Sequence, residues 1–148
     1  MNLDDLEAQR IARKMLSQEG TGFAWGIKYL DGGVGWAKVS FIVKDDMLNG
    51  HNTIHGGMLF ALADTAFAYA CNSRNNKTVA QQASMAFLSP ASAGETLTVI
   101  AREVTLEGRS GVYNAVVTGE DDRVVATFQG LSRTIRGHII ETINEGNK

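Results

Sequence analysis

Asp64 is the residue of this sequence whose setting most strongly suggests chemistry. It interrupts the run Met58–Cys71, which is rich in Ala and Leu, short of β-branched residues and apolar on every face. Burying a lone carboxylate is unfavourable and raises its pKa unless a partner stabilises the charge. No basic residue lies within one helical turn of Asp64. A buried Asp bonded to a backbone group or to Thr65 is the structural alternative, but the pattern favours a functional carboxylate.

Two glycines, Gly56 and Gly57, stand at the point where this apolar run begins. Glycine weakens a helix and lets a ligand approach the backbone closely. Free N–H groups at a helix N-terminus, together with the helix dipole, favour negative charge, and this is the arrangement of an oxyanion hole. A plain tight turn is the simpler explanation for a glycine pair taken alone.

The loop before the glycines contains three further polar residues, Asn49, His51 and His55. His51 and His55 lack the glutamate of the zinc-protease pattern, and no other carboxylate stands at ligand spacing, so we expect no metal site. A lone loop histidine is more often a surface or hydrogen-bonding residue than a catalyst. The functional interpretation of His55 therefore rests on its position next to Gly56.

The spacing of Gly56 and Asp64 has a geometric consequence. Eight residues on one helix span about 12 Å along the axis, and the two residues lie on different sides of it. They cannot both contact one scissile bond within a single chain. If both are catalytic, the helix N-terminus of one copy must meet the Asp of another. A two-fold dimer would then contain two equivalent sites.

The elements that must position these residues indicate an α+β fold. Periodicity predicts an amphipathic helix over Asn2–Ser17 and a buried helix over Met58–Cys71, preceded by a loop over Asp45–Gly57. Strands are predicted at Phe23–Leu30, Gly35–Val43, Val79–Leu88, Thr96–Leu106, Gly111–Gly119 and Arg123–Arg136, with the turn Asp31-Gly32-Gly33 after the first. Short connections favour antiparallel neighbours. One long helix against five or six strands leaves an edge and part of a face exposed, so we expect oligomerisation.

Composition limits the class of protein. The 148 residues fit one domain, with a helical segment at 1–20 and a loosely held tail at 138–148. A formal net charge of -2 argues against a nucleic-acid partner. One cysteine, Cys71, allows no internal disulfide and favours a reducing compartment. No secretory signal precedes the first helix, and the apolar run is too short to cross a membrane. We therefore expect a cytoplasmic protein with no membrane partner.

The segment Asn49–Gly57, followed by Asp64 in the helix, resembles the signature of hotdog-fold acyl-CoA thioesterases, most closely the phenylacetyl-CoA branch. The resemblance continues through Phe87–Ala91 and Gly94–Leu97 to Val124–Gly137, and so covers most of the chain beyond the first helix. It implies a single hotdog domain over residues 1–148, in which an antiparallel sheet wraps one long central helix and an extra helix lies at the N-terminus. It also implies homodimers that assemble into homotetramers.

The resemblance assigns roles to four residues. Asp64 matches the catalytic carboxylate, which acts either as general base for water or as nucleophile. Gly56 matches the glycine whose backbone N–H polarises the thioester carbonyl. His55 matches a residue that hydrogen-bonds near that carbonyl or the sulfur, and Asn49 matches one that helps place the water or the substrate. No metal and no cofactor are implied.

Further residues are candidates for binding the substrate. Gly57 shares the free N–H groups of the helix start with Gly56. Arg109, and after it Arg136, are candidates to contact the CoA nucleotide, although solvated surface charges explain them equally well. Phe60 and Met85 would line the acyl pocket, unless they are ordinary core.

One position departs from the family pattern. Some relatives have Ser or Thr on the strand after the helix, where it assists the water, and the matching position here is Ala80. Thr78 and Gln81 lie nearby in sequence, and the role stays unassigned. An Asp rather than a Glu at position 64 points to the phenylacetyl-type branch.

Two other functions are compatible with such a fold. A non-catalytic acyl-CoA sensor could dispense with the carboxylate, so Asp64 counts against it. A dehydratase for hydroxyacyl-CoA needs a His and an acid set for proton abstraction beside the thioester, whereas the loop here resembles the thioesterase pattern. The sequence therefore predicts hydrolysis of aryl-type or short to medium acyl-CoA thioesters.

Overall fold

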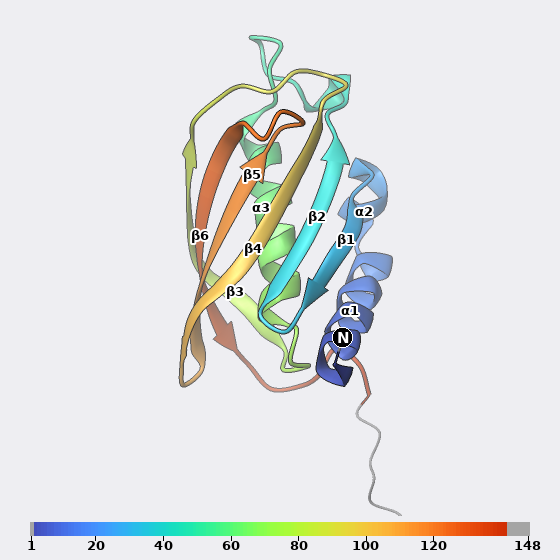
Figure 1. Cartoon of the computed structure of the whole chain (residues 1–148), viewed down its shortest axis with the longest axis vertical. Coiled ribbons are helices and arrows are strands. Elements are labelled where there is room, and N and C mark those ends of the chain that lie inside the picture. The colour runs from blue at the N-terminus through green and yellow to red at the C-terminus, as the bar shows by residue number, and fades with distance from the viewer. Residues whose placement is uncertain (1, 142–148) are drawn as a thin grey trace, which may run out of the picture.

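A six-stranded antiparallel sheet curves around one long helix in the computed structural model, which describes residues 2–141 (Figure 1). The helical elements are α1 (Leu3–Gln18), α2 (Gly20–Trp25), the 3-10 turn η1 (Asp45–Met47) and α3 (Gly56–Cys71). The strands are β1 (Lys28–Gly33), β2 (Trp36–Ile42), β3 (Thr78–Phe87), β4 (Thr96–Glu107), β5 (Ser110–Thr118) and β6 (Val124–Thr134), in the sheet order β1-β2-β4-β5-β6-β3. The predicted α+β architecture, with its central helix and extra N-terminal helix, is confirmed.

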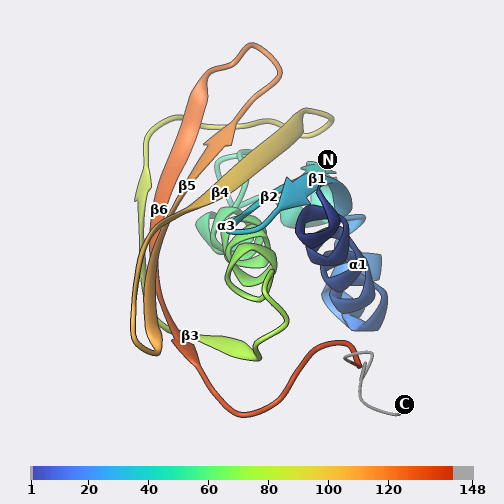
Figure 2. The ribbon, with the colours of Figure 1, turned by 60° about the horizontal axis from the view of Figure 1, so that its bottom comes forward.

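Figure 2 shows α3 on the concave side of the sheet, and the hydrophobic core is built from residues of both. Alternate residues of each strand point inward, which is the period of a strand with one buried face. Inward side chains such as Val39, Phe41 and Val99 meet Leu62 and Phe67 of the helix, and all five are buried. The apolar character of α3 on almost every side therefore follows from its place in the middle of the molecule.

One side of α3 is less well covered than the rest. Ala61, Asp64, Thr65 and Ala68 are half-buried, whereas Leu62 and Ala63 beside them are fully buried. We call the four half-buried residues the open face of α3. The apolar residues of a central helix are normally covered completely by the rest of the protein. Because this face of α3 is only partly covered, it is available to a further partner.

The two edge strands of the sheet differ in how well they are covered. β1 is covered by α1, which packs along it. β3 pairs with β6 on one side and has no strand on the other among the described residues. Most of its side chains are exposed on both faces, including Val79 and Phe87. An uncovered edge of this length is a template for pairing with another chain.

The first predicted strand is wrong in part. Residues 23–25 belong to α2, not to a strand, and Phe23 is 94% exposed. Alternating apolar residues suggested a strand, but Gly26, at φ 65°, ends a short helix there. The strand itself is β1, three residues longer at its C-terminal end than the prediction.

The predicted turn is displaced for a packing reason. Gly32 and Gly33 lie inside β1, and the turn falls at Val34 and Gly35, where Gly35 has φ 79°. A Cβ on Gly32 would lie 2.3 Å from the Tyr29 hydroxyl. The glycines are therefore present for close approach within the strand, not for the turn.

The segment after β6 is held by hydrogen bonds to Asn75. Asn75, buried and at φ 62°, accepts hydrogen bonds at its Oδ1 from the backbone N–H groups of Ile139 and Ile140, each at 2.9 Å. Its Nδ2 donates to the Ile140 carbonyl at 3.0 Å. The tail predicted to be loosely held from residue 138 is thus attached at 139–140, and the rest of that prediction, 142–148, lies outside the described residues.

Candidate active site

The backbone N–H of Gly56 is a free hydrogen-bond donor at the start of α3. His55 is the N-cap residue, and its Nδ1 accepts from the Gly57 N–H at 2.8 Å. The His55 carbonyl accepts from the N–H groups of Met58 and Leu59. Within residues 2–141 the Gly56 N–H has no acceptor. A donor left open at the positive end of a helix is suited to an anion or a developing oxyanion.

This N–H borders a pocket of about 360 Å³. The pocket lies between the loop before α3 and the segment that follows β3, and its lining comprises Asn49, Thr53, Ile54, Gly56, Leu59 and Phe87–Pro90. A Cβ on Gly56 would lie 3.1 Å from the ring of Phe87. Glycine at position 56 therefore keeps both the donor and the space in front of it accessible. Gly57, whose N–H is already bonded to His55, does not line this pocket.

His55 is held in one orientation by its own cap. Because Nδ1 accepts the Gly57 N–H, the neutral ring must have its proton on Nε2. The side chain is exposed at the mouth of α3. Nε2–H can therefore donate outward to a ligand while the ring stays attached to the helix.

Asn49 shapes the loop that precedes the helix. Its Oδ1 accepts from the N–H of His51 at 2.9 Å and of Thr53 at 3.3 Å, and its Nδ2 donates to Thr53 Oγ1 at 3.0 Å. A bridge between Leu48 and Ile54 closes this loop. Asn49 thus borders the pocket and also fixes the backbone that leads into Gly56. Both effects place the free N–H.

Asp64 lies on the open face of α3 with no hydrogen-bond partner within residues 2–141. The nearby hydroxyl of Thr65 donates to the Ala61 carbonyl at 2.7 Å, so the expected alternative, an Asp satisfied by Thr65, is not found. Desolvation by burial raises the pKa of Asp64 above the usual value of 3.8. A half-buried carboxylate without a partner and with a raised pKa has the properties of a general base.

Asp64 sets the acidic limb of the expected pH dependence. In the role expected for Asp64, as general base or nucleophile, the reacting form is the carboxylate, and the raised pKa moves its deprotonation to higher pH. Turnover is therefore expected to rise with pH through a pKa above 3.8, the ordinary value for Asp, and then to reach a plateau. The kcat of the wild-type protein, measured from pH 4 to pH 8 with a stability control at each pH, tests this. An acidic limb at or below the ordinary Asp value would contradict it.

A second half-buried carboxylate lies within electrostatic reach of Asp64. Glu19, between α1 and α2, accepts a hydrogen bond from the Tyr69 hydroxyl at 2.9 Å. Desolvation raises the pKa of Glu19, and the charge of Asp64 raises it further. Sequence reasoning missed this pair because Glu19 and Tyr69 are 50 residues apart, and neither occurs in a recognisable motif.

The two arginines predicted to bind the nucleotide lie far from Gly56 in the same chain. Arg109, in the β4–β5 turn, borders a small cavity together with Cys71, the last residue of α3. Its carbonyl accepts from the Thr134 N–H at 2.8 Å, close to Arg136 in sequence. A helix of 16 residues is about 24 Å long. A single chain therefore does not bring Arg109 and Gly56 together.

The two predicted acyl-pocket residues do meet, on Phe128 of β6. The rings of Phe60 and Phe128 form an edge-to-face pair with centroids 5.4 Å apart. Met85 of β3 is the cross-strand partner of Phe128. Phe60 and Met85 are both half-buried and so remain within reach of a ligand at the open face of α3.

The strand position that differs from the family pattern offers no hydroxyl. Ala80 is exposed in β3, opposite Ser132 of β6. Thr78 donates its hydroxyl to the Asn76 carbonyl at 2.7 Å, so it is already bonded. Gln81 lies in a β-bulge and is exposed. Of the three, Gln81 has a polar side chain free to reach outward.

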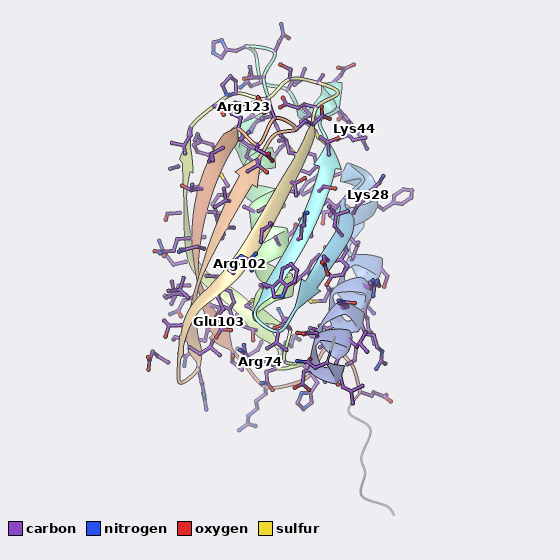
Figure 3. The ribbon with its side chains drawn as sticks, in the orientation of Figure 1. Lys28, Lys44, Arg74, Arg102, Glu103 and Arg123 are labelled. Atoms are coloured by element: carbon purple, nitrogen blue, oxygen red, sulfur yellow. The ribbon has the colours of Figure 1, made fainter. Side chains whose placement is uncertain are left out.

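Arg123 fixes the segment that forms one wall of the pocket, and sequence reasoning overlooked it (Figure 3). Its guanidinium donates to Ser89 Oγ at 3.2 Å, to the Pro90 carbonyl at 3.0 Å and to Glu95 at 2.7 Å. It also pairs with Asp121 at 2.9 Å. These partners lie 28 to 34 residues from Arg123 or in its own turn, so no local pattern reveals the cluster.

Replacing Arg123 by Gln should loosen the pocket wall. A neutral amide cannot replace the several parallel donors of the guanidinium. We expect KM for a thioester substrate to rise several-fold, kcat to change less, and the thermal midpoint to fall. Arg133→Gln is a matched control, because Arg133 is exposed on β6, the strand that directly follows Arg123, and makes no ion pair among the described residues. Equal kinetics for the two variants would contradict a positioning role for Arg123.

The described residues contain no group of three or more His, Cys, Asp or Glu side chains placed to hold a metal ion. Within the same residues, no helix is long and apolar enough to span a membrane.

Comparison with known proteins defines the class. Residues 51–126 match the thioesterase superfamily model, and this range contains the His55–Gly56 cap and Asp64. The chain belongs to the thioesterase superfamily, and the hotdog fold and the enzyme class expected from the sequence are confirmed.

Within that class the chain is similar to the acyl-coenzyme A thioesterase PaaI of Escherichia coli, with 41% identity over 133 residues that cover 90% of this chain and 95% of that one. The structure of the E. coli PaaI protein from the phenylacetic acid degradation operon superposes with a TM-score of 0.89 at 40% identity, covering 90% and 97% of the two chains. A Thermus thermophilus protein, TT0310, gives 0.76 at 38% identity, over 80% and 99%. A Streptococcus mutans protein bound to acetyl CoA gives 0.73 at 24% identity, over 76% and 90%, and shows the shared fold.

Proposed function

We propose that the protein hydrolyses acyl-CoA thioesters, with aryl acids such as phenylacetate as the acyl group. The observation that carries this proposal is the free Gly56 N–H at the start of α3, facing a pocket beside the capped ring of His55. An N–H in this position can donate a hydrogen bond to the thioester oxygen and so stabilise the negative charge that develops there. The relationship to the E. coli acyl-coenzyme A thioesterase supports the substrate class.

Asp64 supplies the second half of the chemistry. As general base it accepts a proton from water while the water oxygen attacks the thioester carbon. The oxyanion bonds to the Gly56 N–H, the C–S bond then breaks, and the departing sulfur takes the proton to leave as a thiol. If Asp64 attacks directly instead, an acyl-enzyme anhydride forms first, and water then hydrolyses it.

The active site is completed by a second copy of the chain. Gly56 and Asp64 are separated by about 12 Å along α3, so one chain cannot present both to one bond. The open face of α3 contains Asp64, and the neighbouring edge of β3 is uncovered. A two-fold dimer through these surfaces brings Asp64 of one copy to Gly56 of the other. Dimers then pair into a homotetramer.

Thiol release from a substrate panel tests the activity. The panel comprises phenylacetyl-CoA, hydroxyphenylacetyl-CoA, benzoyl-CoA and straight-chain acyl-CoAs, with a thiol-reactive colour reagent as readout. We expect the aryl-acetyl substrates to have the highest kcat/KM. Binding of acyl-CoA without thiol release from any substrate would instead indicate a sensor.

A further inference from the structure

Phe60 lies midway along α3 between Gly56 and Asp64, four residues from each. Residues four apart on a helix are neighbours on one side of it, with Cβ atoms about 5–6 Å apart. Helical side chains also lean toward the N-terminus, so the Asp64 carboxylate leans over the turn that contains Phe60. Both side chains are half-buried. A ligand held at Asp64 therefore lies within reach of the Phe60 ring.

Phe128 of β6 supports the Phe60 ring from behind. The two rings form an edge-to-face pair with centroids 5.4 Å apart and an interplanar angle of 69°. The Phe67 ring lies 5.7 Å from that of Phe128, and the Tyr113 ring lies 5.4 Å from that of Phe67. A Cβ on Gly130 would lie 2.8 Å from the Phe67 ring, so glycine makes room for this ring. Because Phe128, Phe67 and Tyr113 are all buried in a close-packed core, Phe128 has no room to move away from Phe60.

Strand β3 extends this apolar region on the side of α3 away from α1, where Figure 2 shows β3 and β6 next to each other. Met85 is the cross-strand partner of Phe128, and Ala83 lies two residues earlier on the same face of the strand. Both are half-buried. We call Phe60, Ala83 and Met85 the acyl surface. It combines a fixed ring with one small and one flexible apolar side chain.

A fixed phenyl ring distinguishes aromatic from aliphatic ligands. An aromatic ligand ring gains an edge-to-face or offset contact with Phe60 in addition to the apolar area that it buries. An alkyl chain buries apolar area without this contact, and it loses more rotational freedom when it is held in place. The acyl surface therefore favours a flat aryl group.

We propose that Phe60, held in place by Phe128, contacts the acyl group and makes the site prefer an aryl ring to an alkyl chain. Phe60 is the specificity-determining residue. Phe128 is a positioning residue, because it acts through Phe60 and does not touch the ligand. The inference rests on the proposed acyl-CoA substrate but not on its hydrolysis, since binding alone reports the preference.

Calorimetric titration of the Asp64→Asn protein provides the test, because this variant should not consume the ligand during the measurement. Phenylacetyl-CoA is compared with octanoyl-CoA, whose acyl group has the same number of carbon atoms. The measured quantity is the aryl preference, the Kd for octanoyl-CoA divided by the Kd for phenylacetyl-CoA. Phe60→Leu and Phe128→Leu should each lower the aryl preference by about two- to tenfold, because each removes or frees the fixed ring. Leucine keeps an apolar side chain at both positions.

The double variant shows whether Phe128 acts through Phe60. If it does, Phe128→Leu should not lower the aryl preference further once Phe60 is already Leu. Phe41→Leu is the matched control, because Phe41 is also buried in the core but lies on β2. This control should leave the aryl preference unchanged even if it lowers the thermal midpoint.

Three results would overturn the proposal: an unchanged aryl preference in Phe60→Leu, additive effects in the double variant, or an equal loss of preference in Phe41→Leu. A failure of both ligands to bind would overturn it as well. Thiol release by the wild-type protein is measured beside these titrations. Its absence would refute the proposed hydrolysis, whereas a loss of aryl preference confined to the Phe60 and Phe128 variants would still support the inference.

Discussion

Replacing Asp64 by Asn is expected to lower thioester hydrolysis by about 10²–10⁴-fold, the range for loss of a general base. The amide has the shape of the carboxylate but cannot take a proton from water or attack a carbonyl. Steady-state thiol release with phenylacetyl-CoA, compared at saturating substrate, measures the change. Turnover near that of the wild type would refute the catalytic assignment of Asp64.

The same variant should not be less stable. Burial raises the pKa of Asp64 in the folded chain, so the charged carboxylate destabilises the fold at neutral pH. A carboxyl group with a raised pKa loses its stabilising contribution as the pH rises through that pKa. We therefore expect the thermal midpoint of Asp64→Asn at pH 7 to equal or exceed that of the wild type, with the difference disappearing at acidic pH.

Glu19→Gln is the comparison variant for Asp64→Asn, because it removes another half-buried carboxylate. Glu19 is a second half-buried carboxylate with a raised pKa, and it accepts a hydrogen bond from Tyr69. Its replacement should leave the acidic limb of the pH profile in place, because desolvation by burial raises the pKa of Asp64. It should leave most of kcat intact, in contrast to Asp64→Asn.

Mixing two inactive variants should restore activity. In a dimer of one Gly56→Pro subunit and one Asp64→Ala subunit, one of the two shared sites has both wild-type groups and the other has neither. Verified mixed dimers should therefore reach about half of the wild-type turnover, while each parent stays inactive. Subunits exchanged under mild denaturant and separated by two affinity tags provide the measurement. An absence of recovery in such dimers would exclude a site shared in this way.

Proline is chosen for position 56 because the local backbone can accept it. It removes the N–H, and the first position of a helix tolerates its fixed φ. His55, at φ -64° and ψ 135°, already has the extended conformation that a residue before proline requires. The ring of Phe87 must shift for any side chain at position 56. Gly56→Ala makes the same demand but keeps the N–H, so it should retain far more activity than Gly56→Pro.

Local sequence patterns predicted most of the fold, because the burial of one face of a helix or strand leaves a periodic pattern in neighbouring residues. The all-round apolar run of α3 and the alternation in β2, β4, β5 and β6 follow from burial on a fixed period. The prediction failed at residues 23–25, where alternating apolar residues form a short helix. There the choice depends on Gly26 and on packing against α1, which the periodicity does not contain.

The sequence by itself determined the class of protein, the central helix and the isolation of Asp64, because each depends on residue types at short spacing. Tertiary structure decided the rest. The free Gly56 N–H, the orientation of His55 and the open face of α3 emerge only when the chain is packed. Arg123 meets Ser89 and Glu95, and Met85 meets Phe128, through contacts between distant segments. Such contacts come from the register of the sheet, and many different sequences can supply the same register.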